Sequence, residues 1–141
     1  EIVIPNSVTS IGAGAFQQSG LEKIKLSNNI TSIEEYTFYT CNKLEEITIP
    51  EGVKSIGDRA FMECGIKKLI VPEGVKSIGS DFLGRTNKNE IVREIILPAS
   101  VETIGSPNMS HEEPKHIKVI VPKGSYAEKW AREYGFNVVL E

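Results

Sequence analysis

The sequence repeats itself, and the length of the repeat constrains the fold more than any other feature. The segment VTSIG at residues 8–12 returns as VKSIG at residues 53–57 and 75–79, with weaker copies at 30–34 and 101–105. A short β-branched segment precedes each copy, and the ends of successive segments lie 22, 23, 22, 26 and 24 residues apart. Repeats of this size fold as a solenoid, because one repeat cannot bury its apolar face until its neighbours stack on it.

Apolar residues occupy the same offsets in every repeat, which predicts a continuous core built from columns of like residues. In the second repeat these positions are held by Leu21, Ile24, Leu26, Ile30, Ile33 and Phe38. Each such side chain contributes about 1.5–3 kcal/mol when fully buried. Proline ends most of the short strands, because it has no N–H to give to a ladder of hydrogen bonds.

The pattern Leu-x-x-Ile-x-Ile-Pro, then Val-x-x-Ile-Gly, then Ala-Phe-x-x-Cys resembles the BspA-like, or Treponema pallidum-type, leucine-rich repeats. The match is best in the first three coils, where Phe38 precedes Cys41 and Phe61 precedes Cys64. The resemblance implies an α/β solenoid, mostly β, wound as a right-handed superhelix of about six coils with a parallel concave sheet. A right-handed parallel β-helix is the rival fold, and the Leu-x-x-Ile-x-Ile strand favours the leucine-rich repeat.

Extra residues in the fourth and fifth coils leave the local register open. They lie around residues 87–90 and 106–114. Either Phe82 or Leu83 takes the aromatic position of the fourth coil, and the fifth offers Met109. Either His116 or Ile117 takes the leucine position of the last coil.

The last residues depart from the repeat and predict a cap over the open end of the core. Ser125 with Glu128 three residues later matches a capping box at a helix start. Ala127, Trp130, Ala131 and Tyr134 then follow at helical spacing, and residues 136–140 have the pattern of a closing strand. We therefore divide the domain into repeat coils at residues 1–123 and a helix-and-strand cap at residues 124–141. A ligand platform made by Trp130 and Tyr134 is the less favoured interpretation.

Composition excludes several classes of function. The formal net charge is -3, which argues against a general affinity for nucleic acid or anionic membrane. No apolar run approaches the ~20 residues that cross a bilayer.

The chain opens in the middle of a repeat, so we expect further coils upstream, and we expect a monomer.

The sequence offers no set of residues for catalysis, a metal or a cofactor. His111 and His116 with Glu112 and Glu113 predict at most a weak metal site, and a solvated loop is favoured. Cys41 and Cys64 share a column, and we favour buried free thiols over a disulfide. We therefore expect no enzyme, no cofactor and no metal.

Strand alternation turns two rows of side chains outward on the predicted sheet. The charged row alternates in sign at every coil: Glu1, Lys23, Glu46, Lys68, Glu94 and Lys118. The second outward row is Val3, Lys25, Thr48, Ile70, Ile96 and Ile120, and its last three members form an isoleucine row on a face expected to meet water. Selection for register explains the charged row better than binding does. The isoleucine row serves either strand propensity or a partner, with neither favoured.

The family resemblance implies a bacterial cell-surface or secreted protein that takes part in adhesion and protein–protein contact. We therefore predict a recognition module that binds a protein or glycan through the sheet face. The candidate contacts are Lys25, Thr48, Ile70, Ile96 and Ile120, with Lys68, Glu94 and Lys118 as a polar rim. A structural spacer or stalk, and an accessory domain attached to an enzyme, are the alternatives.

Overall fold

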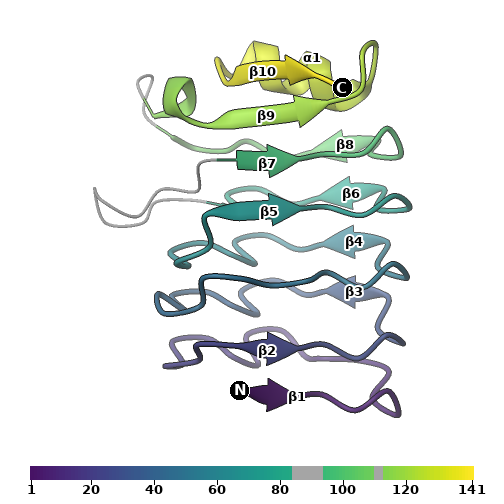
Figure 1. Cartoon of the computed structure of the whole chain (residues 1–141), viewed down its shortest axis with the longest axis vertical. Helices are drawn as coiled ribbons and strands as arrows, with labels where there is room; N and C mark the ends of the chain where they lie inside the picture. Colours follow the sequence, from purple (N-terminus) through teal and green to yellow (C-terminus); the bar gives the residue numbers. More distant parts are fainter. Residues whose placement is uncertain (84–93, 110–112) are drawn as a thin grey trace.

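The computed structural model describes residues 1–83, 94–109 and 113–141. They form a straight solenoid of about five turns, with the N-terminus at one end of the stack and the C-terminus at the other (Figure 1). The predicted solenoid of parallel sheets with one C-terminal helix is confirmed.

The front of the stack is made of short parallel strands, and among the described residues the third coil contributes none. They are β1 (Ile2–Val3), β2 (Ile24–Lys25), β5 (Lys68–Ile70), β7 (Glu94–Ile96), β9 (Lys118–Val121) and β10 (Asn137–Leu140). They fall into two groups, β1-β2 and β5-β7-β9-β10. Pairing sets Lys68 opposite Glu94 and Glu94 opposite Lys118, so neighbouring coils lie in the register that the repeat predicts.

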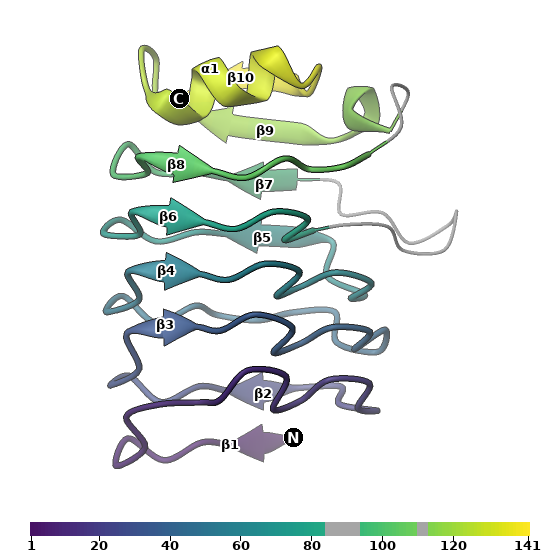
Figure 2. The ribbon, with the colours of Figure 1, turned by 180° about the vertical axis from the view of Figure 1, so that it is seen from behind.

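A second parallel sheet covers the back of the stack, which the sequence analysis did not anticipate (Figure 2). Its strands are β3 (Ser32–Ile33), β4 (Ser55–Ile56), β6 (Ser77–Ile78) and β8 (Thr103–Ile104), in that order. Each strand turns a hydroxyl outward and buries an isoleucine, because successive residues of a strand face opposite sides. The repeated Val-x-x-Ile-Gly segment is therefore a strand followed by a bend.

Turns that carry the phenylalanines form a third side of each coil. Backbone hydrogen bonds link these turns, from Phe16 N to Thr37 O (3.0 Å) and from Phe38 N to Ala60 O (2.9 Å). The rings of Phe16, Phe38 and Phe61 stack in a column, with centroids 5.6 and 5.5 Å apart. Each stacked pair adds about 0.5–1.5 kcal/mol beyond the burial of its area.

A column of glycines allows the back of each coil to approach the next. A Cβ built on Gly57 would lie 2.4 Å from Glu35 N, and one on Gly79 would lie 2.5 Å from Asp58 N. A Cβ built on Gly105 would likewise lie 2.5 Å from Ser80 N. These contacts are with backbone, which cannot move aside without breaking the ladder, so only glycine fits at these three positions. The second coil has Glu34 at the equivalent position.

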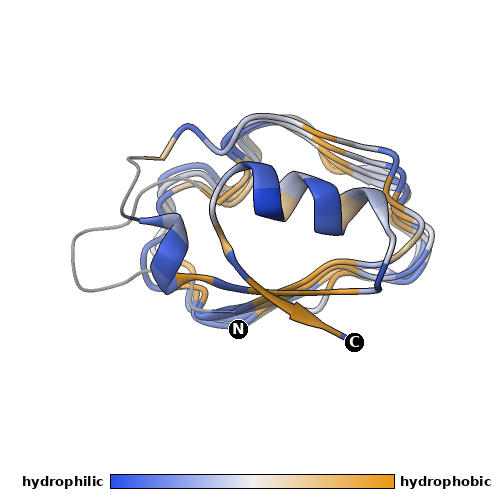
Figure 3. Ribbon diagram, turned by 90° about the horizontal axis from the view of Figure 1, so that it is seen from above, coloured by the Kyte–Doolittle hydropathy of each residue, from blue (hydrophilic) through white to orange (hydrophobic). Residues whose placement is uncertain are grey.

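The C-terminal helix α1 (Tyr126–Glu133) lies across the end of the core, as seen along the stack in Figure 3. Ser125 caps it by accepting a hydrogen bond from Glu128 N at 3.1 Å. Trp130 is 3% exposed, stacks on Phe136 and donates its Nε1–H to Gly105 O at 3.1 Å. The predicted C-terminal helix is confirmed and lies where the sequence places a cap, and the burial of Trp130 argues against the ligand platform.

The structure settles the two register questions. Tyr36 and Arg59 have left-handed backbones two residues before Phe38 and Phe61, and Asp81 adopts the same conformation two residues before Leu83. Leu83 therefore takes the aromatic position. In the last coil Ile117 is 1% exposed and takes the leucine position, while His116 ends the 3-10 helix η1 (Pro114–His116) and is exposed.

Replacing one glycine of the column tests how tightly the coils are spaced. We expect Gly79→Ala to lower the free energy of unfolding by about 1–3 kcal/mol, because its Cβ collides with the neighbouring coil. Gly12→Ala is the matched control, since nothing lies within 4 Å of its added Cβ, and it should be neutral or slightly stabilising. Urea unfolding of both variants makes the comparison, and equal stabilities would contradict the close approach.

Removing the cap tests its role at the end of the core. A chain that ends before residue 124 exposes the apolar surface that α1 covers, so we expect a lower melting temperature and aggregation. Scattering and a thermal melt measure both effects. A truncated chain that remains monomeric and melts like the full chain would show that α1 is dispensable.

Candidate functional site

The isoleucine row forms a contiguous apolar strip on the front face. Ile70 lies opposite Ile96 on the next strand, and Ile96 lies opposite Ile120 on the strand after it. Ile70 is 54% exposed, and the other two are half-buried. Apolar side chains that touch across neighbouring strands make one surface rather than scattered exposed residues.

Val139 extends this strip by a fourth residue that sequence analysis missed. Parallel pairing of β10 with β9 places Val139 opposite Ile120, and Val139 is 38% exposed. The sequence predicted a closing strand at residues 136–140. It did not show that the strand continues the front sheet rather than folding over the end of the core.

The charged row lies beside the strip and is paired where the strands pair. Lys68 Nζ lies 3.4 Å from Glu94 Oε1, and Lys67 Nζ lies 3.9 Å from Glu45 Oε1 next to it. Lys118 follows in register opposite Glu94. The side chains of Lys68 and Glu94 are 53% and 29% exposed, so their ion pair contributes about 0–1 kcal/mol.

The remaining predicted contacts lie apart from the strip. Lys25 is exposed on β2, opposite Val3, in the separate two-stranded group. Thr48 belongs to the front segment of the third coil, which forms no strand. Among the described residues, the backbone of residues 45–49 makes no hydrogen bond to the coils on either side.

The break in the front sheet at the third coil opens a cleft of about 620 Å³. Its lining is mostly charged and spans four coils: Glu1, Lys23, Ile24, Glu45, Glu46, Ile47, Thr48, Lys67, Lys68 and Ile70. The cleft joins the charged row to one end of the isoleucine row through Ile70. It therefore adds polar groups to the same face as the apolar strip.

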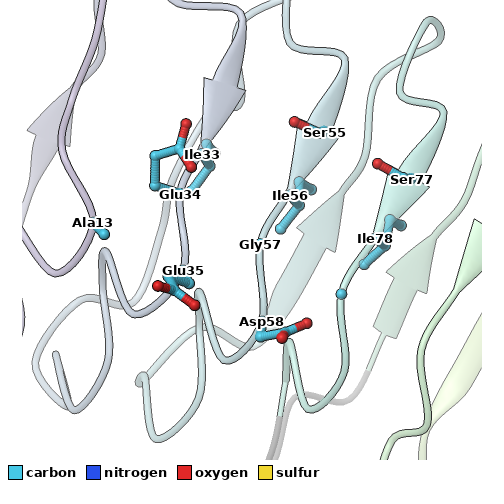
Figure 4. Close-up of a pocket in the computed structure, with 11 residues that line it drawn as sticks. Ala13, Ile33, Glu34, Glu35, Ser55, Ile56, Gly57, Asp58, Ser77 and Ile78 are labelled. Carbon is cyan, nitrogen blue, oxygen red and sulfur yellow. The ribbon is translucent and has the colours of Figure 1, made fainter.

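A second, smaller hollow of about 390 Å³ lies at the back, along the glycine column (Figure 4). The hydroxyl groups of Ser55 and Ser77 lie along its strands, and the carboxylates of Glu34, Glu35 and Asp58 lie near it. Asp58 is already engaged, since its Oδ1 accepts a hydrogen bond from Ser80 N at 2.8 Å.

Three stacked turn residues form a polar cluster that sequence analysis did not single out. Arg59 Nη1 donates to Tyr36 Oη at 2.5 Å, and Arg59 Nε lies 3.5 Å from Asp81 Oδ2. The hydrogen bond with Tyr36 raises the pKa of Arg59 further above its ordinary value. Asp81 Oδ1 is buried without a hydrogen-bond partner. The cluster links three coils along the edge of the stack.

Cys41 and Cys64 are buried free thiols, as predicted. Their Sγ atoms lie 3.0 Å from Phe16 O and 2.8 Å from Phe38 O, so each thiol bonds a carbonyl of the preceding coil. The hydrogen bond with Cys41 and burial raise the pKa of the Cys64 thiol. The Cys64 thiol is therefore held protonated, which suits a core residue rather than a nucleophile.

The described residues contain no group of three or more His, Cys, Asp or Glu side chains that could hold a metal ion. The predicted weak site around His111 and Glu112 lies outside those residues. No helix in the described parts of the chain is long and apolar enough to cross a membrane.

The geometry and the repeat agree with one family. Residues 1–90 match the sequence profile of the BspA type leucine rich repeat region, which comprises six copies. This chain belongs to the BspA-type leucine-rich repeat family. Proteins of this family are repeat proteins, and membership by itself identifies neither a ligand nor a reaction.

Solved structures of leucine-rich repeat proteins share the fold. A leucine-rich repeat protein from Bacteroides ovatus is 29% identical, with a TM-score of 0.73 over 99% of this chain and 36% of its own length. The pneumococcal vaccine antigen PcpA is 19% identical, with a TM-score of 0.66 over 99% of this chain and 41% of its own. The T. pallidum leucine rich repeat protein TpLRR is 22% identical, with a TM-score of 0.64 over 97% and 71%. No protein of curated function matches, and the chain spans well under half the length of the first two structures.

Reversing one charge tests whether the charged row stabilises the register. Lys68→Glu places an acidic side chain beside Glu94, and we expect a loss of about 1 kcal/mol at low salt that shrinks as salt rises. Lys25→Glu is the control. It makes the same change of charge, but the residue opposite it is Val3 and not a carboxylate. Denaturant unfolding at two salt concentrations measures both, and a loss independent of salt would point to packing.

Proposed function

We propose that this repeat domain is a non-catalytic recognition module that binds a protein or glycan through the front face of its solenoid. The observation that carries the proposal is the strip of Ile70, Ile96, Ile120 and Val139 on a face that otherwise meets water. A soluble sheet normally turns polar side chains outward. An apolar strip with a polar rim is instead the usual arrangement of a contact surface.

The rim is present on this face. Lys68, Glu94 and Lys118 run beside the strip, and the charged cleft at the third coil adjoins Ile70. A narrow strip of single residues from adjacent strands fits a loop or a peptide segment better than a broad protein surface. Lys25 lies away from the strip, on β2, and we give it a smaller part in the proposed contact.

A surface or extracellular location in a bacterial protein is part of the proposal. The support is membership of the BspA-type family and the fold shared with a vaccine antigen of the pneumococcus. We propose that the module acts as a monomer, without a cofactor and without nucleic acid as a partner. A spacer or stalk is the second candidate, favoured by the straight and regular stack in Figure 1. An accessory domain attached to an enzyme remains compatible with the same binding surface.

Changing the isoleucine row to threonine tests recognition against the spacer. The triple variant Ile70→Thr, Ile96→Thr and Ile120→Thr keeps β-branched residues on the strands and removes apolar area. We expect the folded variant to lose the ligands that the unaltered protein selects from a glycan array or a displayed peptide library, by about tenfold or more in affinity.

Val3→Thr is the matched control, since Val3 is 60% exposed at the same outward position of the first coil. It should leave selection unchanged. Ligands that bind the triple variant as tightly as the unaltered protein would place the contact elsewhere. The absence of any selected ligand would favour the spacer.

A further inference from the structure

The outer edge of β10 offers unpaired backbone groups at the end of the front sheet. Asn137 N donates to Ile117 O at 3.1 Å, and Glu141 N donates to Val121 O at 2.9 Å, both across the edge that faces β9. Backbone groups of successive strand residues point to opposite edges. The N–H and C=O groups of Val138 and Leu140 therefore face outward, away from β9.

Nothing in the described part of the chain pairs with this edge, since β9 is the one neighbour of β10 in the sheet. Proteins usually protect such edges with charged residues, prolines or bulges. Residues 137–140 contain no charged residue and no proline, and no left-handed residue interrupts them. Among the described residues, this edge therefore has free backbone groups for another strand.

Exposed apolar side chains gather at the same end of the stack. Seven large hydrophobic residues are exposed in the described chain, and four of them are Tyr126, Tyr134, Val139 and Leu140. All four belong to α1, its C-cap or β10, and Figure 3 shows β10 as a hydrophobic strand beside α1 at this end of the stack. Leu140 lies in register with the buried Val121 and is still 42% exposed.

We propose that the outer edge of β10 binds an extended segment of a partner polypeptide, which joins the front sheet as an additional strand. The outward N–H and C=O groups of Val138 and Leu140 match the backbone of a strand, and a glycan or a small anion has no such alternation of donors and acceptors. The segment carries uncharged aliphatic or β-branched side chains at alternate positions. One of its faces then continues the apolar strip past Val139, and the other covers Leu140.

This proposal concerns the edge of the sheet and does not depend on the recognition role of its face. The probe is an acetylated and amidated peptide with the sequence of residues 116–121, because that sequence already pairs with the other edge of β10. Amide hydrogen exchange followed by NMR reports each backbone group of β10. In the free protein we expect rapid exchange at Val138 and Leu140 and slow exchange at Val139, whose N–H faces β9.

Addition of the peptide should slow exchange at Val138 and Leu140. The same peptide with N-methylated amides on alternate residues keeps its side chains and should fail to do so. If the peptide protects none of the β10 amides, or protects them equally when N-methylated, the edge does not bind a strand. If it instead shifts the signals of Ile70 and Ile96 alone, the edge proposal fails while the face remains a recognition surface.

Two variants separate backbone from side chain. Leu140→Pro removes one outward N–H and leaves the bonds to β9, and edge strands tolerate proline at such a position. Leu140→Ala keeps the N–H and removes most of the side chain. We expect the proline variant to bind the peptide about fivefold more weakly than the alanine variant.

Slow exchange at Val119 and Val139 in the proline variant shows that the strand pair is intact. Equal affinities of the two variants would overturn main-chain recognition. Sedimentation of the free protein tests whether a second copy of the chain occupies the edge. A dimer that forms with concentration and is lost in Leu140→Pro would show that a second copy, rather than a partner, takes the edge.

Discussion

Close approach of successive coils at the back of the stack is the constraint on which the rest of the structure depends. There the N–H of Gly57 donates to Ile33 O at 2.7 Å, and the N–H of Gly79 donates to Ile56 O at 2.8 Å. Each glycine both makes the hydrogen bond and leaves out the Cβ that would prevent it. Once this spacing is set, the isoleucine beside each glycine lies over its equivalent in the next coil, and the core follows from one column to the next.

The back and front of the stack differ in how regularly their strands pair from coil to coil. The back sheet runs without interruption from β3 through β4 and β6 to β8. The front sheet breaks at the third coil, where residues 45–49 bond to neither neighbour among the described residues and the cleft opens. The stack stays intact at this level because Leu44, Ile49 and Val53 remain buried in the core. Among the described residues, the interruption at this level lies in the front sheet, while the back sheet continues across it.

Sequence alone predicted the features that the repeat dictates. In a solenoid the neighbour of a residue is the residue one repeat away, so the columns, the facing pairs Lys68 and Glu94, and the need for a cap at Trp130 could all be derived from spacing. Prediction stopped where the repeat length changes. The choices between Phe82 and Leu83 and between His116 and Ile117 depend on local backbone conformation, which the left-handed residue Asp81 and the helix η1 decide.

Features that depend on the exact distance between neighbouring coils also could not be predicted from the sequence. The third coil carries the same Leu-x-x-Ile-x-Ile pattern as its neighbours, and it still forms no front strand, because pairing needs a spacing that the pattern does not encode. The position of Val139 beyond Ile120 likewise depended on β10 adding to the sheet in parallel rather than crossing the end of the core.

Inward residues fix the fold of a solenoid, and outward residues are left to serve other needs. On the back sheet those outward positions hold Ser55, Ser77 and Thr103, which meet the simple need for solubility. On the front sheet, from the fourth coil onward, isoleucines fill one of the two outward rows, beside the charged row, and the same line ends on the unprotected edge of β10. The exposed isoleucine row and the unprotected edge of β10 lie on one face and at one end of the molecule. Strand propensity alone does not explain why they occur together. Strand propensity would favour β-branched residues equally on the back, where serine occupies the outward positions 55 and 77. The front of the C-terminal half is therefore where we place the partner of the proposed function.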